Sequence, residues 1–289
     1  MRKRLEIFPW VNGVIMIVIA LVTLYPIWYV LINSVLTYED SMRGASMLWP
    51  SSITAQSYQS IFRDNTITGG FLISVARTAC ATLGHVLFTA AVAYPLSKKY
   101  LAGRKVYMRI GLITMLFSGG LIPTFVLIHG MGLYNSFLVY VIPALFSYYN
   151  MLIFRTFFMG MPASIEESAK MDGAGDLRIF FTIVLPNAKA VVATIALYAI
   201  VYHWNDVLVG YIYVRNNSLK PLQTILYRIL SENLGAQMQK QAMNAMGKRV
   251  SANTIKYAAM MMAILPILMV YPFLQRYLIK GAMLGAIKE

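Results

Sequence analysis

Long apolar stretches, separated by short polar segments, dominate the chain. Six of them reach the roughly 20 mostly apolar residues that a membrane-spanning helix requires. The six stretches are Phe8–Leu36, Gly70–Ser97, Arg109–His129, Phe137–Phe158, Asn187–Val214 and Tyr257–Lys280. No small-residue cleavage site follows the first stretch, so we expect an anchor and not a removed signal peptide. The pattern therefore predicts an all-α membrane protein with six transmembrane helices.

Composition supports this class and narrows the chemistry. Of 289 residues, 58% are hydrophobic and 12% are charged, whereas soluble domains carry about 25% charged residues. The single cysteine, Cys80, excludes an intrachain disulfide. The sequence has no H-E-x-x-H metal pair, no G-x4-G-K-[ST] nucleotide loop and only three widely spaced histidines. These absences argue against an intramembrane enzyme. Neither inverted repeats nor broken helices are visible in the sequence, which argues against an ion-coupled secondary transporter.

The net charge of +14 does not indicate a nucleic-acid partner, because the basic residues follow the membrane pattern. Fifteen lysines and arginines fall at the termini and in the segments around residues 98–109 and 155–189. The other side carries ten, and seven of these lie between Arg215 and Lys256. With that loop set aside, one side of the membrane carries 15 lysines and arginines and the other carries 3. Because cytoplasmic segments are enriched in these residues, the bias predicts that both termini are cytoplasmic.

The polar segment Met161–Pro186 carries helix signals instead of loop signals. Ser164 and Glu167 have the S-x-x-E spacing of a capping box, which predicts a helix start at Ser164. Glu166 and Glu167 would then occupy the first turn, where the helix dipole favours negative charge. We expect this helix to run to about Asp172.

Glycines and a proline predict the rest of this segment. Gly173 and Gly175 would provide the left-handed or open backbone of a sharp turn. A second short helix, Asp176–Val184, would follow and stop at Pro186, which suits the first turn of a further helix. The result is a helix–turn–helix that lies outside the membrane between two spans.

The spacing within this segment resembles the EAA loop of ATP-binding-cassette (ABC) importer permeases, EAA-x3-G-x9-I-x-L-P. Glu167-Ser168-Ala169, Gly173 and Ile183-Val184-Leu185-Pro186 match it, with Ser168 in place of the first alanine. In that family the segment is a coupling helix that docks on a separate ATPase subunit. The resemblance implies that the coupling residues are Glu166, Glu167, Ser168, Ala169, Asp172, Gly173 and Ala174.

The end of the chain, YLIKGAMLGAIKE, extends the resemblance to the maltose-type sugar permeases, from about Phe71 to Lys288. This implies a type I importer (MetI-like) fold in the cytoplasmic membrane of a bacterium, and a heterodimer with a second permease. It also implies an extracellular or lipid-anchored solute-binding protein, and two ATPase subunits that carry ATP and Mg²⁺, while this chain binds no cofactor or metal. We expect an N-terminal helix and external segment at 1–69, a transmembrane domain at 70–280 and a cytoplasmic tail at 281–289.

Polar residues within the predicted spans are candidates for the substrate pathway, because ionisable groups in membranes usually face a cavity or a partner. The candidates are Arg77, Tyr148, Tyr149, Asn150, Trp204, Asn205 and Asp206. Arg77 could instead reach the headgroups, or it could pair with Asp206 in a structural role. The aromatic and amide side chains suit sugar rings, but they also suit helix packing. We expect His85 to be a hydrogen-bonded packing residue.

The loop from Arg215 to Lys256 carries seven basic residues and one acid, Glu232. Because this patch opposes the charge bias, we expect it to have a function at the external mouth, with Arg215, Lys220, Lys248 and Arg249 as docking candidates. One hypothesis is that it attracts an acidic, uronate-containing oligosaccharide, with Arg77 extending the positive field into the cavity. The alternative is that it only docks the binding protein and that the sugar is a neutral one of the maltose type.

Overall fold

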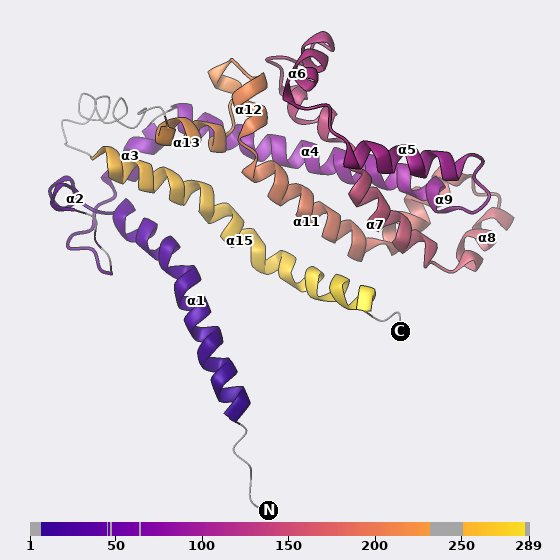
Figure 1. Ribbon diagram of the computed structural model, residues 1–289, viewed down its shortest axis with the longest axis horizontal. Coiled ribbons are helices and arrows are strands. Elements are labelled where there is room, and N and C mark those ends of the chain that lie inside the picture. Colours follow the sequence, from indigo (N-terminus) through magenta and orange to yellow (C-terminus); the bar gives the residue numbers. More distant parts are fainter. Residues whose placement is uncertain (1–6, 45, 47, 64, 232–250, 287–289) are drawn as a thin grey trace, which may run out of the picture. The chain divides into compact units, whose positions relative to one another are not determined.

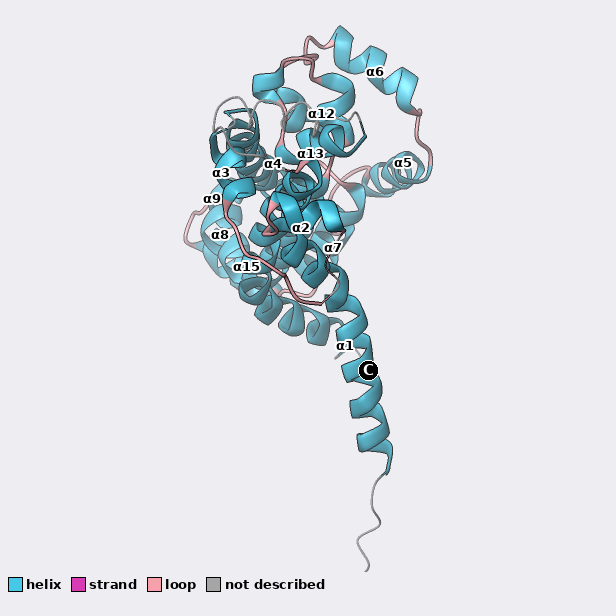
Figure 2. Cartoon of the chain, turned by 90° about the vertical axis from the view of Figure 1, so that its left-hand side faces the viewer, coloured by secondary structure: helices cyan, strands magenta, loops and turns pink. Residues whose placement is uncertain are grey.

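The computed structural model describes residues 7–44, 46, 48–63, 65–231 and 251–286. Every regular element in these residues is a helix (Figures 1 and 2). The chain forms two compact units, residues 1–68 with 226–266 and residues 69–225 with 267–289. The helix content agrees with the predicted all-α class.

The first unit holds the N-terminal helix α1 (Ile7–Ser34) and two short helices, α2 (Tyr38–Arg43) and α3 (Gln56–Arg63). The Ser34 hydroxyl lies 2.7 Å from the hydroxyl of Tyr58 on α3, so the end of α1 is fixed to α3. The Tyr29 ring meets the edge of Tyr257 with centroids 5.9 Å apart. The first two-thirds of α1 are exposed, as expected of an apolar helix that faces lipid or another subunit.

The second unit contains most of the remaining elements. They are α4 (Asn65–Ser97), α5 (Arg104–Leu116), α6 (Leu121–Gly130), the 3₁₀ helices η1 (Phe137–Tyr140) and η2 (Ile142–Ala144), α7 (Tyr148–Met159), α8 (Ala163–Met171), α9 (Asp176–Ile179), the π-helical turn η3 (Phe180–Val184), α10 (Leu185–Asn187), α11 (Lys189–Asn205), α12 (Leu208–Tyr213) and the 3₁₀ helix η4 (Asn217–Leu219). The helices α13 (Leu222–Ser231) and α15 (Ala252–Ala286) run through both units. Residues 281–286 belong to α15, and the predicted division into domains stays a prediction.

The number of possible membrane spans agrees with the prediction. In the described residues, Phe8–Ser34, Asn65–Ser97 and Ala252–Met269 are single helices long and apolar enough to cross a membrane. Three bent helix pairs bring the total to six if each pair counts as one span. The first, second and sixth predicted spans are thus continuous helices, and the middle three are broken.

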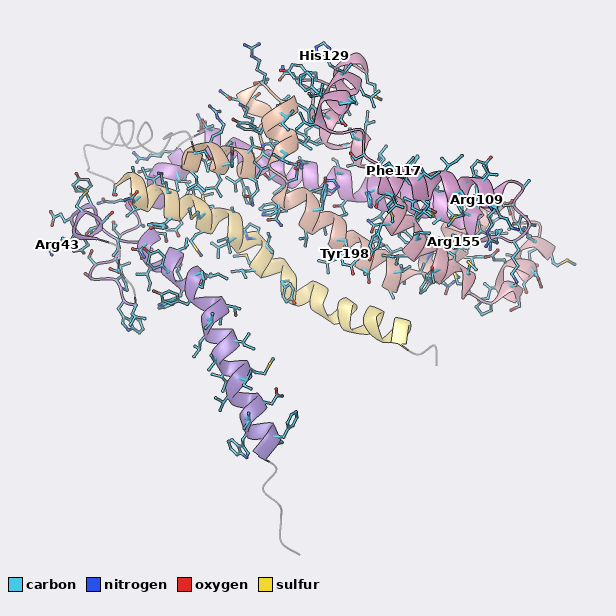
Figure 3. The ribbon with its side chains drawn as sticks, in the orientation of Figure 1. Arg43, Arg109, Phe117, His129, Arg155 and Tyr198 are labelled. Carbon is cyan, nitrogen blue, oxygen red and sulfur yellow. The ribbon has the colours of Figure 1, made fainter. Side chains whose placement is uncertain are left out.

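The third predicted span, Arg109–His129, is wrong as a single helix. The helices α5 and α6 are bent by 116° at Phe117–Gly120. Gly120 has φ +83°, a left-handed value that favours glycine. Figure 3 shows Phe117 at this bend and His129 at the far end of α6. The Gly119-Gly120 pair thus terminates one helix and begins the next.

The fourth and fifth predicted spans are also interrupted. Two 3₁₀ helices, with Pro143 at the start of η2, precede α7 at a bend of 47°. An 83° bend separates the helical run Asp176–Asn187 from α11. The helix α11 then ends at Asn205, and extended backbone at Asp206 leads into α12. The predicted stretch Asn187–Val214 is therefore two helices with a corner at Asp206.

An apolar core holds the parts of the second unit around α4. Ala90 and Ala93 of α4, Phe154 of α7 and Ile195 of α11 are fully buried in one cluster. The small side chains on α4 let its neighbours approach closely. Arg155 Nε also donates to the Leu96 carbonyl over 2.9 Å, so α7 satisfies one of the free carbonyls at the end of α4. This core connects the two candidate sites described below.

Candidate functional site: a polar cavity and a helical hairpin

A cavity of about 540 Å³ opens within the second unit, between α4, the η1–η2 segment, α7, α11 and α12. Its size matches that of small-molecule pockets, about 300–1,000 Å³. The polar lining consists of Arg77, His85, Ser147, Asn150, His203 and Asp206, and the aromatic lining consists of Tyr140, Phe146, Tyr149, Tyr198 and Tyr202.

Arg77 and Asp206 form an ion pair in this cavity. Arg77 is 1% exposed. One Arg77 Nη donates to the Asp206 carboxylate, and the other donates to the Asp206 carbonyl over 3.0 Å. The guanidinium carbon also lies 4.6 Å from the Tyr140 ring centroid, a cation–π contact. Pairing is therefore the observed state of Arg77, in agreement with one of the three roles predicted for it.

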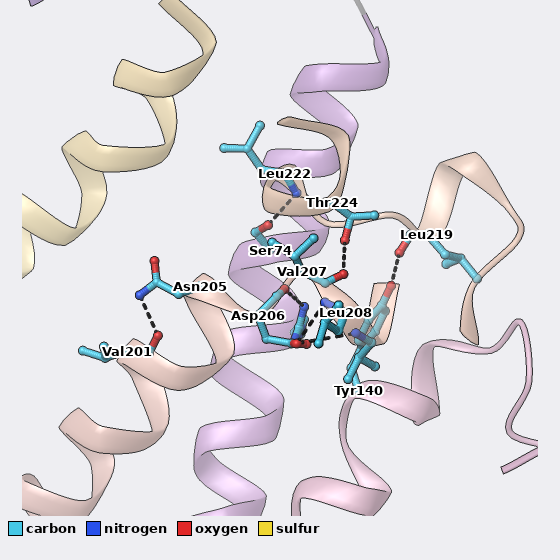
Figure 4. A network of polar contacts seen from close by, with 12 residues as sticks. Ser74, Tyr140, Val201, Asn205, Asp206, Val207, Leu208, Leu219, Leu222 and Thr224 are labelled. Atoms are coloured by element: carbon cyan, nitrogen blue, oxygen red, sulfur yellow. Dashed lines mark hydrogen bonds and ion pairs between the residues drawn. The ribbon is translucent and has the colours of Figure 1, made fainter. Parts of the chain in front are cut away.

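The corner between α11 and α12 positions Asp206 for this pair (Figure 4). Asp206 Oδ1 accepts from the N–H groups of Leu208 at 3.1 Å and Val209 at 3.4 Å, while Oδ2 accepts from Arg77. The Tyr140 hydroxyl donates to the Leu219 carbonyl over 2.9 Å, which fixes the ring that faces Arg77. The Asp206 carboxylate is therefore held by one side chain and two backbone N–H groups.

The Nε atom of Arg77 is buried and makes no hydrogen bond in the part of the chain that the structure describes. A guanidinium presents five N–H donors, and an unsatisfied buried donor is costly. The cavity therefore contains a fixed, buried cation with remaining capacity for an acceptor.

His85 joins α4 to the start of α7. Its Nδ1 lies 2.7 Å from the Ala144 carbonyl, and its Nε2 lies 2.8 Å from the amide nitrogen of Asn150. Both contacts are satisfied if Nδ1–H donates to Ala144 and Nε2 accepts from Asn150, which is a neutral tautomer. The hydrogen-bonded role expected of His85 is thus observed, and the same side chain also lines the cavity.

Four of the seven predicted pathway residues line the cavity: Arg77, Tyr149, Asn150 and Asp206. The other three do not. The Tyr148 hydroxyl donates to the Met108 carbonyl over 2.6 Å, Trp204 packs edge-on against Phe71, and Asn205 Nδ2 donates to the carbonyl of Val201 over 2.8 Å. Consecutive helical residues point about 100° apart, so a run of three polar residues cannot all face one cavity.

Seven polar or aromatic lining residues were not among the predicted pathway residues, namely His85, Tyr140, Phe146, Ser147, Tyr198, Tyr202 and His203. Helical spacing could have indicated some of them. Arg77 and His85 are eight residues apart, and Tyr198 and Tyr202 are four apart, so each pair shares a helix face.

The segment Met161–Pro186 forms the predicted helical hairpin, but its start differs. The helix α8 begins at Ala163 after Pro162, with no side-chain cap. Ser164 therefore lies inside the helix and the predicted capping box is wrong, as is the placement of Glu167 in the first turn, which holds Glu166. The reason is that Pro162, with φ −59°, already provides the backbone entry into the helix.

The end of α8 agrees with the prediction and is a Schellman motif. Gly173 has φ +79°. Its N–H donates to the Lys170 carbonyl, and the N–H of Ala174 donates to the Ala169 carbonyl, both over 3.0 Å. Ala169 is buried and Ala174 packs against the same core, which is the hydrophobic contact that accompanies this motif. Gly175, with φ −73°, does not need glycine's conformational range.

The second arm of the hairpin agrees with the prediction, because Pro186 lies in the first turn of the short helix that follows Val184. The chain continues through α9, the π-helical turn η3 and α10 to Asn187, with Pro186 in the first turn of α10. Proline is tolerated there because its missing N–H is not needed in a first turn.

Charged side chains on α8 have different surroundings. Glu166 pairs with Lys98, and Glu167, Ser168 and Asp172 are exposed. Lys170 Nζ lies 3.2 Å from Asp176 Oδ1. The hydrogen bond to Asp176 raises the pKa of Lys170, with a smaller contribution from Tyr100. Lys170 therefore remains charged at neutral pH and joins the two arms of the hairpin.

The basic loop is only partly within the described residues. Arg215 is exposed, and its backbone N–H donates to Asn135 Oδ1 over 3.0 Å. Lys220 follows η4. Lys248 and Arg249 lie outside the described residues, so the proposed role of the basic patch stays a prediction.

Comparison with known proteins places the chain in a family. A model of the "binding-protein-dependent transport system inner membrane component" family matches residues 5–283. The chain belongs to this family. It is a permease subunit of an ABC sugar importer, and the predicted MetI-like fold and maltose-type resemblance are confirmed.

Two Bacillus subtilis (strain 168) proteins are similar over nearly their whole length. The polygalacturonan/rhamnogalacturonan transport system permease protein YtcP is 36% identical over 94% of this chain and 95% of its own. Protein LplC is 32% identical over 92% of this chain and 90% of its own. Among solved structures, a chain of a bacterial ABC transporter that imports the acidic polysaccharide alginate matches with a TM-score of 0.86 and 29% identity, covering 96% of this chain and 98% of that one.

Proposed function

We propose that this chain is one half of a heterodimeric permease in a bacterial cytoplasmic membrane. A second related permease forms the other half, and a solute-binding protein delivers the sugar from outside. Two ABC ATPase subunits bind ATP and Mg²⁺ and hydrolyse ATP, so this chain itself is no enzyme and binds no cofactor. The family description, with its binding-protein dependence and inner-membrane component, supports this assembly, and the charge bias supports cytoplasmic termini.

The hairpin around α8 is the proposed docking element for an ATPase. Its accessible side chains support this role, because Met171 is 88% exposed and Glu167, Ser168 and Asp172 are exposed. Ala169 faces inward and holds the helix on the core. The Gly173 turn fixes the angle at which the exposed face is presented.

The proposed substrate is an acidic, uronate-containing oligosaccharide. The observation that carries this proposal is the similarity to YtcP, whose name specifies polygalacturonan and rhamnogalacturonan, over 94% of this chain. Polygalacturonan is a polymer of a uronic acid. The matching alginate importer transports an acidic polysaccharide as well.

The cavity is the proposed route for this sugar, and its lining suits the task. Aromatic rings at Tyr149, Tyr198 and Tyr202 provide faces for pyranose rings, and Asn150 offers polar groups to hydroxyls. Arg77 cannot extend a free positive field, because Asp206 neutralises it. A substrate carboxylate would bind Arg77 by replacing the Asp206 carboxylate, which retains two backbone donors after such an exchange.

A neutral oligosaccharide is the second candidate. The observation that favours it is the Arg77–Asp206 ion pair. Asp206 neutralises the arginine of the described cavity lining, so no net positive charge from this arginine remains to attract an anion. A neutral sugar would bind through the aromatic faces and hydroxyl hydrogen bonds alone.

Reconstitution separates the two candidates. The complete importer in proteoliposomes, with its binding protein, is tested for ATPase stimulation by oligogalacturonates and by malto-oligosaccharides of equal length. We expect stimulation by the oligogalacturonates, and we expect Arg77→Gln to reduce their uptake per assembled importer more than that of the malto-oligosaccharides. Equal stimulation by the neutral series, with normal uptake by Arg77→Gln, would reject the acidic substrate.

A further inference from the structure

Three side chains connect α8 to the Ser97 end of α4. Lys98 Nζ pairs with both carboxylate oxygens of Glu166. The Tyr94 hydroxyl donates to Glu166 Oε2 over 3.1 Å. Lys98 Nζ also lies 4.5 Å from the centroid of the Tyr94 ring. Each of the three side chains thus contacts both of the others.

This cluster is largely shielded from solvent. The side chains of Lys98 and Glu166 are 16% and 14% exposed, and Tyr94 is 8% exposed. Tyr94 packs against Phe158 and Phe180, with ring centroids 6.1 and 5.5 Å apart. Solvent-exposed ion pairs contribute little, whereas a partly buried pair with an added hydrogen bond holds its geometry more firmly. The cluster therefore fixes the start of α8 to α4.

Neighbouring residues show that the contact is specific. Glu166 and Glu167 are adjacent on α8, but Glu166 points into the cluster and Glu167 is exposed. Lys98 and Lys99 are likewise adjacent, and Lys99 is exposed. In each pair, one residue is used for the contact and the other provides an internal comparison.

The helix that receives this contact also reaches the cavity. Arg77, His85 and Tyr94 all lie on α4, with the first two lining the cavity and the third in contact with Glu166. One continuous helix therefore joins the polar cavity to the hairpin.

We propose that Lys98 and Tyr94 are positioning residues for energy coupling, which transmit displacement of α8 through Glu166 to α4 and so to Arg77 and His85. This inference rests on the proposed docking of α8 on an ATPase. It goes further by naming the side chains through which a movement of the docked hairpin reaches the cavity-lining helix. The cluster is a physical connection between two elements, and its effect on coupling is measurable.

The test uses the complete importer in proteoliposomes and measures sugar molecules transported per ATP hydrolysed. Lys98→Met removes the charge and retains much of the apolar stem, and Lys99→Met is the matched control. We expect Lys98→Met to co-purify with the ATPase but to transport about threefold to tenfold less sugar per ATP. Lys99→Met should match the unaltered importer. Equal coupling ratios for Lys98→Met and the unaltered importer would overturn the proposal.

A charge exchange tests the pair itself. Glu166→Lys alone places two cations together and should uncouple more strongly than Lys98→Met. The double variant Lys98→Glu with Glu166→Lys restores an ion pair of reversed polarity and should recover part of the coupling ratio. If the double variant has no higher a coupling ratio than Lys98→Glu alone and Glu166→Lys alone, the pair has no role in coupling. Loss of ATPase binding in Lys98→Met would also overturn the proposal.

The failure of this inference is distinguishable from the failure of the proposed function. If α8 docks the ATPase but the cluster does not transmit movement, Gly173→Val will lose stimulated ATPase and uptake, whereas Lys98→Met will keep the coupling ratio of the unaltered importer. If α8 has no coupling role, both variants will transport normally.

Discussion

Gly173 offers the most direct test of the hairpin's role, because its requirement for glycine is purely conformational. Its φ of +79° lies in the left-handed region, and a Cβ added there would meet no atom within 4 Å. A substitution therefore strains the backbone without a steric clash against any neighbour. Gly175, two residues later, has open space around it as well but an ordinary φ of −73°. The two glycines form a matched pair.

The expected penalty follows from the conformation. A β-branched residue held in a disfavoured backbone region costs about 1–3 kcal/mol, which lowers the population of the observed turn by about fivefold to 150-fold. Gly173→Val should have this effect. Gly173→Asn should have a smaller one, because asparagine tolerates left-handed backbone. Gly175→Ala should be neutral or stabilise by about 0.4–1 kcal/mol.

The assay measures assembly, stimulated ATPase and uptake for the whole importer. We expect Gly173→Val to be inserted in the membrane but to lose binding-protein-stimulated ATPase and uptake, Gly173→Asn to retain an intermediate level, and Gly175→Ala to behave as the unaltered chain. Normal uptake by Gly173→Val would refute the assignment of the turn to coupling. Equal losses in Gly173→Val and Gly175→Ala would refute the conformational reasoning.

Two further predictions concern the buried ion pair and the orientation of the chain. Arg77→Gln or Asp206→Asn should each destabilise the protein by about 3–5 kcal/mol, because each leaves a buried charge unpaired. In detergent, the melting temperature of the double variant should lie closer to that of the unaltered protein. If the losses of stability of the two single variants simply add in the double variant, the pairing is contradicted. In a Cys80→Ala background, an impermeant thiol reagent applied to intact cells should label Ser218→Cys and not Met171→Cys, and the reverse pattern would invert the proposed topology.

The hydrophobic pattern predicts where apolar helices occur but not whether they are continuous. Mean hydropathy over Arg109–His129 is the same for one straight helix and for two helices that meet at 116°. The local signal for the break was the Gly119-Gly120 pair, since φ +83° at Gly120 ends helical geometry. Similarly, Pro143 indicated the irregular η1–η2 segment. Glycine and proline outweigh an averaged apolar pattern at such points.

The hairpin was predicted better at its end than at its start. The left-handed residue that ends a helix is usually a glycine, so the sequence pattern identified Gly173. A helix start has several solutions. Ser164 and Glu167 have capping-box spacing, but Pro162 lies two residues earlier and sets the entry by itself. The partners of Glu166 come from residues 94 and 98, and contacts at that distance in sequence leave no local signal.

The cavity shows the same limit on prediction in three dimensions. Asp206 was predicted as a possible partner of Arg77, because a buried cation in a membrane requires an anion nearby. Their exact contact depends on the corner after Asn205, where α11 ends and the backbone becomes extended. That corner turns Asp206 toward Arg77 and leaves Asn205 bonded to its own helix. Adjacent residues thus acquired different roles from one backbone change.

The helix α4 is unbroken, whereas its neighbours in the second unit are bent, so the two kinds of element should differ in stiffness. Between residues 69 and 225 every other helix long enough for a span is bent, by 116°, 47° or 83°, whereas α4 is a single helix of 33 residues. At about 1.5 Å of rise per residue, Arg77 and Tyr94 lie roughly 26 Å apart along its axis. A continuous helix resists bending because its backbone hydrogen bonds must distort, while a pair of helices can pivot at the break between them. We therefore expect a displacement applied at Tyr94 to be carried along α4 to Arg77 with little loss, while the broken neighbours adjust around it.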